Sequence, residues 1–283
     1  MLPPIATVFG VDFSGAKLAG DNLFLAEVRL RPSQLPLLHS VGPLSALAGT
    51  AERAPVLAKL VELISQSSSA LWGMDFPFAL PIELSPPGTT FDDQLNAVAT
   101  FTGNAQQFGR DCVARCQVAL GRMHVRRTTD SETKTPFDCY HYRIIHQTFH
   151  GMRDVLLPLR SDPSTAILPF DPPDALSQAR RLVAEACPSS TLKRWALPHT
   201  LYKQPAGGPL APKRRATRKI LFAGLRQHID IPEDLQRLIS RNPGGDAADA
   251  VIAALGALHS LSHYNPTSIA AHPRYPREGM VFH

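Results

Sequence analysis

Long apolar runs, regularly spaced cysteines and a leader-like N-terminus are all missing from this chain. Its apolar stretches fall well short of the ~20 residues that a membrane-spanning helix needs, so we expect no membrane span. The N-terminus has neither a basic flank nor a small-residue cleavage site, so we expect no signal peptide. Four cysteines without framework spacing in 283 residues predict a reducing, cytoplasmic setting rather than a disulfide scaffold.

What the chain does contain is typical of a folded domain with an uneven charge. A hydrophobic fraction of 44% and a charged fraction of 19% exclude wholesale disorder, and the length allows one large domain or a domain with an insertion. Residues 1–110 carry six Lys and Arg against nine Asp and Glu, a net charge of −3, whereas the remaining 173 residues carry 23 against 15, a net charge of +8. The basic back half favours a polyanionic partner such as nucleic acid, although a pI near 9 also occurs without one.

The first hundred residues predict a sheet with two acids at strand ends. Val8–Asp12 is a short apolar run that ends in an aspartate before the turn-prone Ser14-Gly15-Ala16, and such a run is typical of a buried strand. Two further strands, over 22–31 and 37–41, precede a helix over 52–66 with apolar residues at helical spacing. A strand over 70–75 then ends in Asp75. Three strands, a helix and a strand form the order of the RNase H-like fold, in which the first and fourth strands are neighbours. We therefore expect Asp12 and Asp75 to lie close enough to share a metal ion.

Residues 83–165 predict a largely helical insertion within a single domain that spans residues 1–283. Helices are expected over 105–123 and 140–157. Cys112, Cys116, Cys139 and His141 fall in this stretch, but their spacing matches no common zinc pattern. We favour buried structural cysteines over a zinc site.

The back half adds three more acids and a basic helix. A strand over 182–188 carries Glu185, and a small, aliphatic helix after Gly244-Gly245 carries Asp246 and Asp249 three residues apart on one face. Acids in a first helical turn also cap it and suit its dipole, which accounts for one aspartate more easily than for two. A helix over 213–228 begins with a cluster of basic residues, which is either a solvated surface or a phosphate-binding one.

The five acids form a donor set suited to a hard divalent cation such as Mg²⁺ or Mn²⁺, which takes oxygen ligands. Two such ions about 4 Å apart activate a water and stabilise the leaving oxygen of a phosphodiester. The chain at these acids resembles a family of uncharacterised proteins described as predicted RNase H-like nucleases. The matching segments are Gly10-Val11-Asp12-Phe13-Ser14-Gly15-Ala16, Asp75-Phe76-Pro77 with Leu80-Pro81, Glu185 with Pro188, Gly245-Asp246-Ala247-Ala248-Asp249-Ala250, and Glu278-Gly279.

The resemblance implies an α/β RNase H-like mixed sheet flanked by helices, and a divalent-metal site on the five acids, but no established substrate. Asp12 is expected to bridge the metals, Asp75 and Asp249 to complete the ligand set, and Asp246 or Glu185 to serve as an outer ligand or to position water. The candidate substrate contacts are Ser14, Lys17, Arg214, Arg215 and Arg218.

The leading interpretation is a metal-dependent nuclease, and two others stay open. One is a nucleotide-binding phosphotransferase or ATPase-like protein of the same superfold, because Asp12-Phe13-Ser14-Gly15 resembles the phosphate-binding turn of those proteins. The other is a non-catalytic RNase H-like module that binds nucleic acid or a protein.

Overall fold

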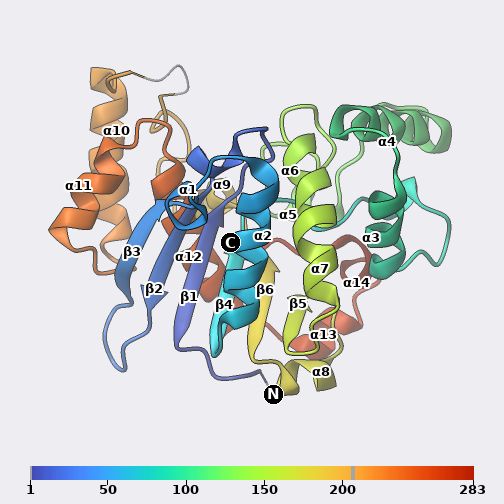
Figure 1. Cartoon of the computed structure of the whole chain (residues 1–283), viewed down its shortest axis with the longest axis horizontal. Coiled ribbons are helices and arrows are strands. Elements are labelled where there is room, and N and C mark those ends of the chain that lie inside the picture. Colours follow the sequence, from blue (N-terminus) through green and yellow to red (C-terminus); the bar gives the residue numbers. More distant parts are fainter. Residues whose placement is uncertain (1, 205–207) are drawn as a thin grey trace.

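A six-stranded mixed sheet organises the chain in the computed structural model, which describes residues 2–204 and 208–283 (Figure 1). The strands are β1 (Thr7–Asp12), β2 (Phe24–Arg29), β3 (Leu37–Pro43), β4 (Ala70–Met74), β5 (Thr165–Leu168) and β6 (Arg181–Glu185). Their order in the sheet is β3-β2-β1-β4-β6-β5. β2 pairs in the antiparallel sense with both β1 and β3, and the pairs β1–β4, β4–β6 and β5–β6 are parallel. This is the expected RNase H-like α/β fold, in which β1 and β4 are neighbours, with β5 added at one edge.

Helices cover both faces of this sheet. The helices before β4 are α1 (Ser45–Ala48) and α2 (Arg53–Gln66). Between β4 and β5 the fully described chain forms α3 (Phe91–Thr100), α4 (Ala105–Leu120), α5 (Thr128–Glu132), α6 (Ile145–His150), a π-helical turn (Gly151–Leu156) and α7 (Leu157–Arg160). After β5 come α8 (Pro173–Gln178), α9 (Pro188–Arg194), α10 (Pro212–Leu225), α11 (Glu233–Arg241), α12 (Asp246–Ser262), α13 (Pro266–Ala270) and α14 (Tyr275–Glu278). Within the described ranges, no helix is both long enough and apolar enough to cross a membrane.

Most of the expected elements form near their predicted ends, but the expected helix over 140–157 does not form as one piece. The chain becomes helical only at Ile145, and a π-helical turn interrupts it from Gly151. Here the Cβ of any larger residue at Gly151 would overlap the ring of Phe76, so the helix backbone lies directly on the segment that follows β4. That α3–α7 constitute an insertion into one domain is our interpretation of the element order.

The two faces of the sheet have separate cores because strand side chains alternate. Val11 and Met74 point to the face covered by α2, whose Leu57, Leu60 and Ile64 belong to the same core cluster. The opposite face carries α12, an alanine-rich helix that is buried along most of its length. Figure 1 shows α2 crossing the near face of the sheet, with α12 beyond it.

Two glycines allow α12 to lie on the sheet at short distance. Gly10 of β1 and Gly73 of β4 are direct partners in the parallel register. A Cβ at Gly10 would lie 1.9 Å from the carbonyl oxygen of Ala250, and one at Gly73 would lie 2.6 Å from the carbonyl oxygen of Ala253. Real Cβ atoms do not come this close to backbone, so both positions require glycine. The close approach places the first turns of α12 over the ends of β1 and β4.

We expect Gly10→Ala to lower the free energy of unfolding by about 1–3 kcal/mol, the usual cost of overpacking a tight interface, because α12 would have to move away from β1. Gly42→Ala is the matched control, because a Cβ at Gly42 meets no atom within 4 Å. It should change stability by no more than about 0.5 kcal/mol. Urea unfolding of both variants measures the difference, and equal stabilities would contradict the packing argument.

Candidate metal centre

Strand alternation places two aspartates on the α12 face of the sheet. Asp12 lies two residues after Gly10, and Asp75 lies two residues after Gly73, so each carboxylate shares the face of its glycine. The pairing of the two strands continues to this point, since the amide of Asp75 donates to the carbonyl of Val11 over 2.9 Å. Asp249 comes from the first turn of α12 on the same face.

These three aspartates form the acid triad. One carboxylate oxygen from each lies within 4.8 Å of the others, and no other group of three potential ligands in the described residues is this close. Asp12 and Asp249 are 8% and 2% exposed, and Asp75 is half-buried. The predicted convergence of Asp12 with Asp75, and of both with the helix near the C-terminus, is therefore present in the structure.

The pKa values of two members of the triad, Asp12 and Asp75, are raised. Burial, and then the charge of Asp249, raise the pKa of Asp12 well above its usual range. The same two causes raise the pKa of Asp75 to about 8. A raised pKa means that the negatively charged form of the carboxyl group is disfavoured. A bound cation would favour that charged form. Perturbed acids in a cavity are also characteristic of functional sites.

Two residues that contact the triad, Tyr202 and Lys203, were not predicted from the sequence. The hydroxyl of Tyr202 donates to Asp249 Oδ1 over 2.7 Å, and the ammonium of Lys203 forms an ion pair with Asp249 Oδ2. The charge of Lys203 opposes the rise in the pKa of Asp12 and Asp75 but does not outweigh burial and the charge of Asp249. Both residues lie in an irregular segment between α9 and α10, so no periodic pattern marks them. One ammonium against three carboxylates leaves the site with a formal charge of −2.

We expect Lys203→Met to tighten Mn²⁺ binding by about tenfold or more, because the ammonium competes with a metal ion for Asp249. A unit charge about 4 Å away is worth ~1–4 kcal/mol at effective dielectric constants between those of water and a protein surface. Calorimetric titration of the metal-free protein measures the change, with the exposed Lys219→Met on α10 as control. Unchanged or weaker binding in the variant would show that Lys203 does not oppose the metal.

Glu185, predicted as a fifth member, points to the other face of the sheet. Its register partner on β4 is Met74, not Gly73, so its side chain leaves the sheet opposite to Asp12 and Asp75. There the guanidinium of Arg127 binds it through two hydrogen bonds, and the amide of Phe78 donates to Glu185 Oε2 over 3.0 Å. The carboxylate of Glu185 is bound by protein donors and lies outside the triad, but it lines the same cavity and its charge raises the pKa of Asp75. A role for Glu185 as an outer ligand or in positioning water stays a prediction.

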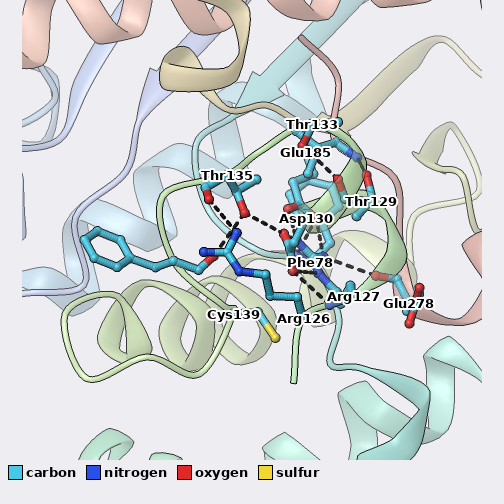
Figure 2. Close-up of polar contacts among 12 residues, drawn as sticks. Phe78, Arg126, Arg127, Thr129, Asp130, Thr133, Thr135, Cys139, Glu185 and Glu278 are labelled. Atoms are coloured by element: carbon cyan, nitrogen blue, oxygen red, sulfur yellow. Dashed lines mark hydrogen bonds and ion pairs between the residues drawn. The ribbon is translucent and has the colours of Figure 1, made fainter. Parts of the chain in front are cut away.

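Arg127 is the centre of a buried ionic cluster (Figure 2). Its side chain is fully buried and also contacts Asp130, with Nε 2.9 Å from Oδ2, and the carbonyl of Glu278 at 3.1 Å. All five guanidinium hydrogens therefore have protein acceptors. The cluster connects α5, the end of β6 and the C-terminal segment. Sequence reasoning missed Arg127 because a buried arginine carries no mark that separates it from exposed Arg126.

Asp246 lies outside the triad although it shares the first turn of α12 with Asp249. Its Oδ2 accepts a hydrogen bond from Asn242 Nδ2 over 3.1 Å, and Asn242 Oδ1 in turn accepts from the amide of Gly245. Gly245 itself adopts φ +94°, a conformation that favours glycine. Asp246 thus holds the side chain of Asn242, whose Oδ1 accepts from the amides of Gly245 and Ala247 at the start of the helix.

The predicted phosphate-binding residues are divided by the structure. Arg214 lines the cavity over the triad and donates to the carbonyl of Lys203. Arg218 is 4% exposed and donates to the carbonyls of Tyr202, Ser240 and Pro243, so it supports the chain around the site instead of facing substrate. Arg215 is exposed on α10 and donates to a backbone carbonyl nearby.

The turn after β1 packs against α6. A Cβ at Gly15 would lie 2.2 Å from the carbonyl oxygen of His146, so the turn packs against the backbone of α6. Gln147 closes it further by donating to the carbonyl of Phe13 over 2.6 Å. Ser14 and Lys17 do not line the cavity over the triad. α6 therefore occupies the space beside Gly15, and substrate contacts by Ser14 and Lys17 stay a prediction.

A cavity of about 430 Å³ opens over the triad. The three aspartates line it together with Tyr202, Lys203 and Arg214, and Phe137 of the segment before α6 also contributes. The cysteines considered for zinc are not part of it: Cys112, Cys116 and Cys139 are buried free thiols, and burial raises the pKa of Cys112 to about 12. The interpretation of these thiols as structural is consistent with their place in the core.

No protein-family model matches this chain. No curated protein matches it in sequence. Among solved structures, the chain is similar to the crystal structure of the yeast mitochondrial Holliday junction resolvase, Ydc2, with a TM-score of 0.37 and 12% sequence identity over 93% of this chain and 83% of that chain. A likeness at this level transfers no activity from that protein to this chain.

Proposed function

We propose that this chain is a divalent-metal-dependent phosphodiesterase that hydrolyses nucleic acid. The observation that carries the proposal is the acid triad, in which three carboxylate oxygens from β1, the end of β4 and α12 lie within 4.8 Å of one another in a cavity wall. The excess of basic residues in the back half of the chain supports a polyanionic substrate.

The residues of the triad fit a hard divalent cation. All three donors are carboxylate oxygens, which Mg²⁺ and Mn²⁺ prefer, and the formal charge of −2 that remains beside Lys203 is the charge of one such ion with opposite sign. Asp12, Asp75 and Asp249 would hold the ion. When bound, it would supply Lewis-acid polarisation of a phosphoryl oxygen and a water of lowered pKa. The remaining predicted acids, Glu185 and Asp246, are held by Arg127 and Asn242.

The protein groups around the triad have distinct tasks in this proposal. Tyr202 fixes one oxygen of Asp249 and leaves the other to face Lys203 or a metal ion. Arg214 and Lys203 place positive charge on the cavity wall, where they would attract a phosphate. The ATPase-like alternative is weakened because the turn that would bind the nucleotide phosphate is closed by His146 and Gln147.

The proposal is tested by incubating the purified full chain with labelled RNA, DNA, hybrid and branched substrates in Mg²⁺, Mn²⁺ or EDTA. We expect cleavage of at least one substrate that needs the metal and is lost in Asp12→Asn. Asp21→Asn, which neutralises an exposed acid away from the site, should retain it. Cleavage that survives Asp12→Asn unchanged would contradict the proposal, and metal binding without turnover on the whole panel would favour the non-catalytic module.

A further inference from the structure

A row of aromatic rings lies beside the acid cavity and has no role in the metal centre. The rings of Phe137 and His141 stack with centroids 4.6 Å apart, and the rings of His141 and Tyr142 follow at 4.4 Å. We call these three residues the ring ledge. The Arg143 guanidinium lies 5.6 Å from the centroid of Phe137 and 5.8 Å from that of Tyr142, and its Nε donates to the Tyr142 hydroxyl. Tyr142 is 72% exposed, so most of its ring is open to solvent.

The ledge lies between two cavities. Phe137, Ile144 and Gln147 line the cavity that contains the acid triad. Tyr140, Tyr142 and Ile145 line a second cavity of about 510 Å³, whose wall also includes Met123 and Arg110. An extended ligand that leaves the triad past Phe137 therefore meets His141 and Tyr142 and then the second cavity. The segment 137–147 borders both spaces.

The segment that carries the ledge exposes more basic than acidic side chains. In residues 122–143, all of which the structure describes, the exposed charged side chains are Arg122, Arg126, Lys134 and Arg143 against Glu132. The Glu132 carboxylate accepts a hydrogen bond from Tyr275, and the other acids of this stretch, Asp130 and Asp138, are buried. Cations next to exposed rings form the combination that binds single-stranded nucleic acid, where the backbone follows the charges and the bases stack on the rings.

We propose that the ring ledge binds unpaired bases of a single-stranded nucleic acid whose backbone enters the acid cavity. This deepens the proposed function, on which it rests, by assigning the substrate class as single-stranded or locally unpaired. Stacking on rings needs a free base face, which a paired base inside a duplex does not offer. A protein partner is the less favoured occupant, because apolar contacts would not require the basic side chains of this segment, of which Arg143 lies over two of the rings.

The test measures binding without cleavage, so that it stays independent of the catalytic proposal. Fluorescence anisotropy in EDTA compares labelled single-stranded DNA, single-stranded RNA and duplex, each longer than the ~4–16 nucleotides typical of a single-strand site. We expect the wild-type chain to prefer single strands over duplex, with the DNA and RNA arms identifying the sugar. Tyr142→Ala should weaken single-strand binding by about fivefold or more, the loss expected from one stacking contact, and leave duplex binding unchanged.

Matched controls separate stacking from charge. Arg143→Gln should weaken single-strand binding more than Arg237→Gln, which removes a positive charge from α11 at a side chain that is 63% exposed. Leu47→Ala, which removes an exposed apolar side chain on α1, should have no effect. Equal affinity for single strand and duplex, unchanged affinity in Tyr142→Ala, or no nucleic-acid binding at all would each overturn the inference, the last leaving a protein as the partner of the ledge. If the wild-type chain binds single strands but cleaves no substrate, the result would contradict only the proposed phosphodiesterase activity.

Discussion

Asp12→Asn is expected to stabilise the metal-free protein and to abolish its stabilisation by divalent cations. In the folded chain the pKa of Asp12 is raised by burial and by Asp249, so at neutral pH the native state either keeps a repelled charge or takes up a proton that the unfolded chain would not bind. Both routes cost free energy, and an amide of the same shape avoids them. Each kcal/mol of stability that is gained should raise the Tm of a chain of about this size by roughly 2–4 °C.

The same substitution removes an anionic ligand from the candidate metal centre. A ligand that binds only the native state stabilises it in proportion to the logarithm of its concentration over Kd, so wild-type Tm should rise steadily with added Mn²⁺. In Asp12→Asn this rise should be absent or much reduced, and activity should fall with it. Thermal melts in EDTA and across a Mn²⁺ series measure both effects, with Asp21→Asn as control. If the variant were less stable than wild type in EDTA, Asp12 would stabilise the metal-free protein through its contacts, which would contradict the prediction.

Much of this centre follows from local sequence patterns. The runs that end in Asp12 and Asp75 are short, apolar and bounded by turn residues, which is enough to predict two parallel strands with acids at the same edge. The small residues around Asp249 predict a helix that packs closely on a sheet, and the structure shows them meeting Gly10 and Gly73. Each of these features is local, so the order of elements along the chain is sufficient to bring the three acids together.

The parts that sequence reasoning missed depend on pairing register or on irregular backbone. Whether Glu185 joins the acids depends on a shift of one residue between β4 and β6, which reverses the face of a strand side chain. Lys203 and Tyr202 reach Asp249 from a segment without periodicity. The closure of the Ser14–Gly15 turn depends on α6, which lies more than a hundred residues further along the chain. None of these contacts can be predicted from a short stretch of neighbouring residues.

Arg127→Met is expected to lower the free energy of unfolding by about 3–5 kcal/mol, the usual cost of breaking a buried ion pair from one side. Arg127 is fully buried and is the cation that both Asp130 and Glu185 contact, as Figure 2 shows. Burial already raises the pKa of Glu185, with Arg127 acting in the opposite direction. Without the guanidinium, two carboxylates would remain in the interior with less than their full set of donors.

The double variant Arg127→Met/Glu185→Gln distinguishes lost charge balance from lost packing. Glutamine removes one of the two uncompensated charges while keeping an acceptor for the amide of Phe78, so the double variant should be more stable than Arg127→Met alone. Arg126→Met is the neighbouring control: its guanidinium is exposed and donates to the carbonyls of Thr135 and Pro136, so its loss should cost about 1 kcal/mol or less. Urea unfolding of the four proteins orders them. If Arg127→Met and the double variant were equally unstable, the cluster would act through the volume of the arginine side chain, and its charges would contribute little to holding α5 against β6.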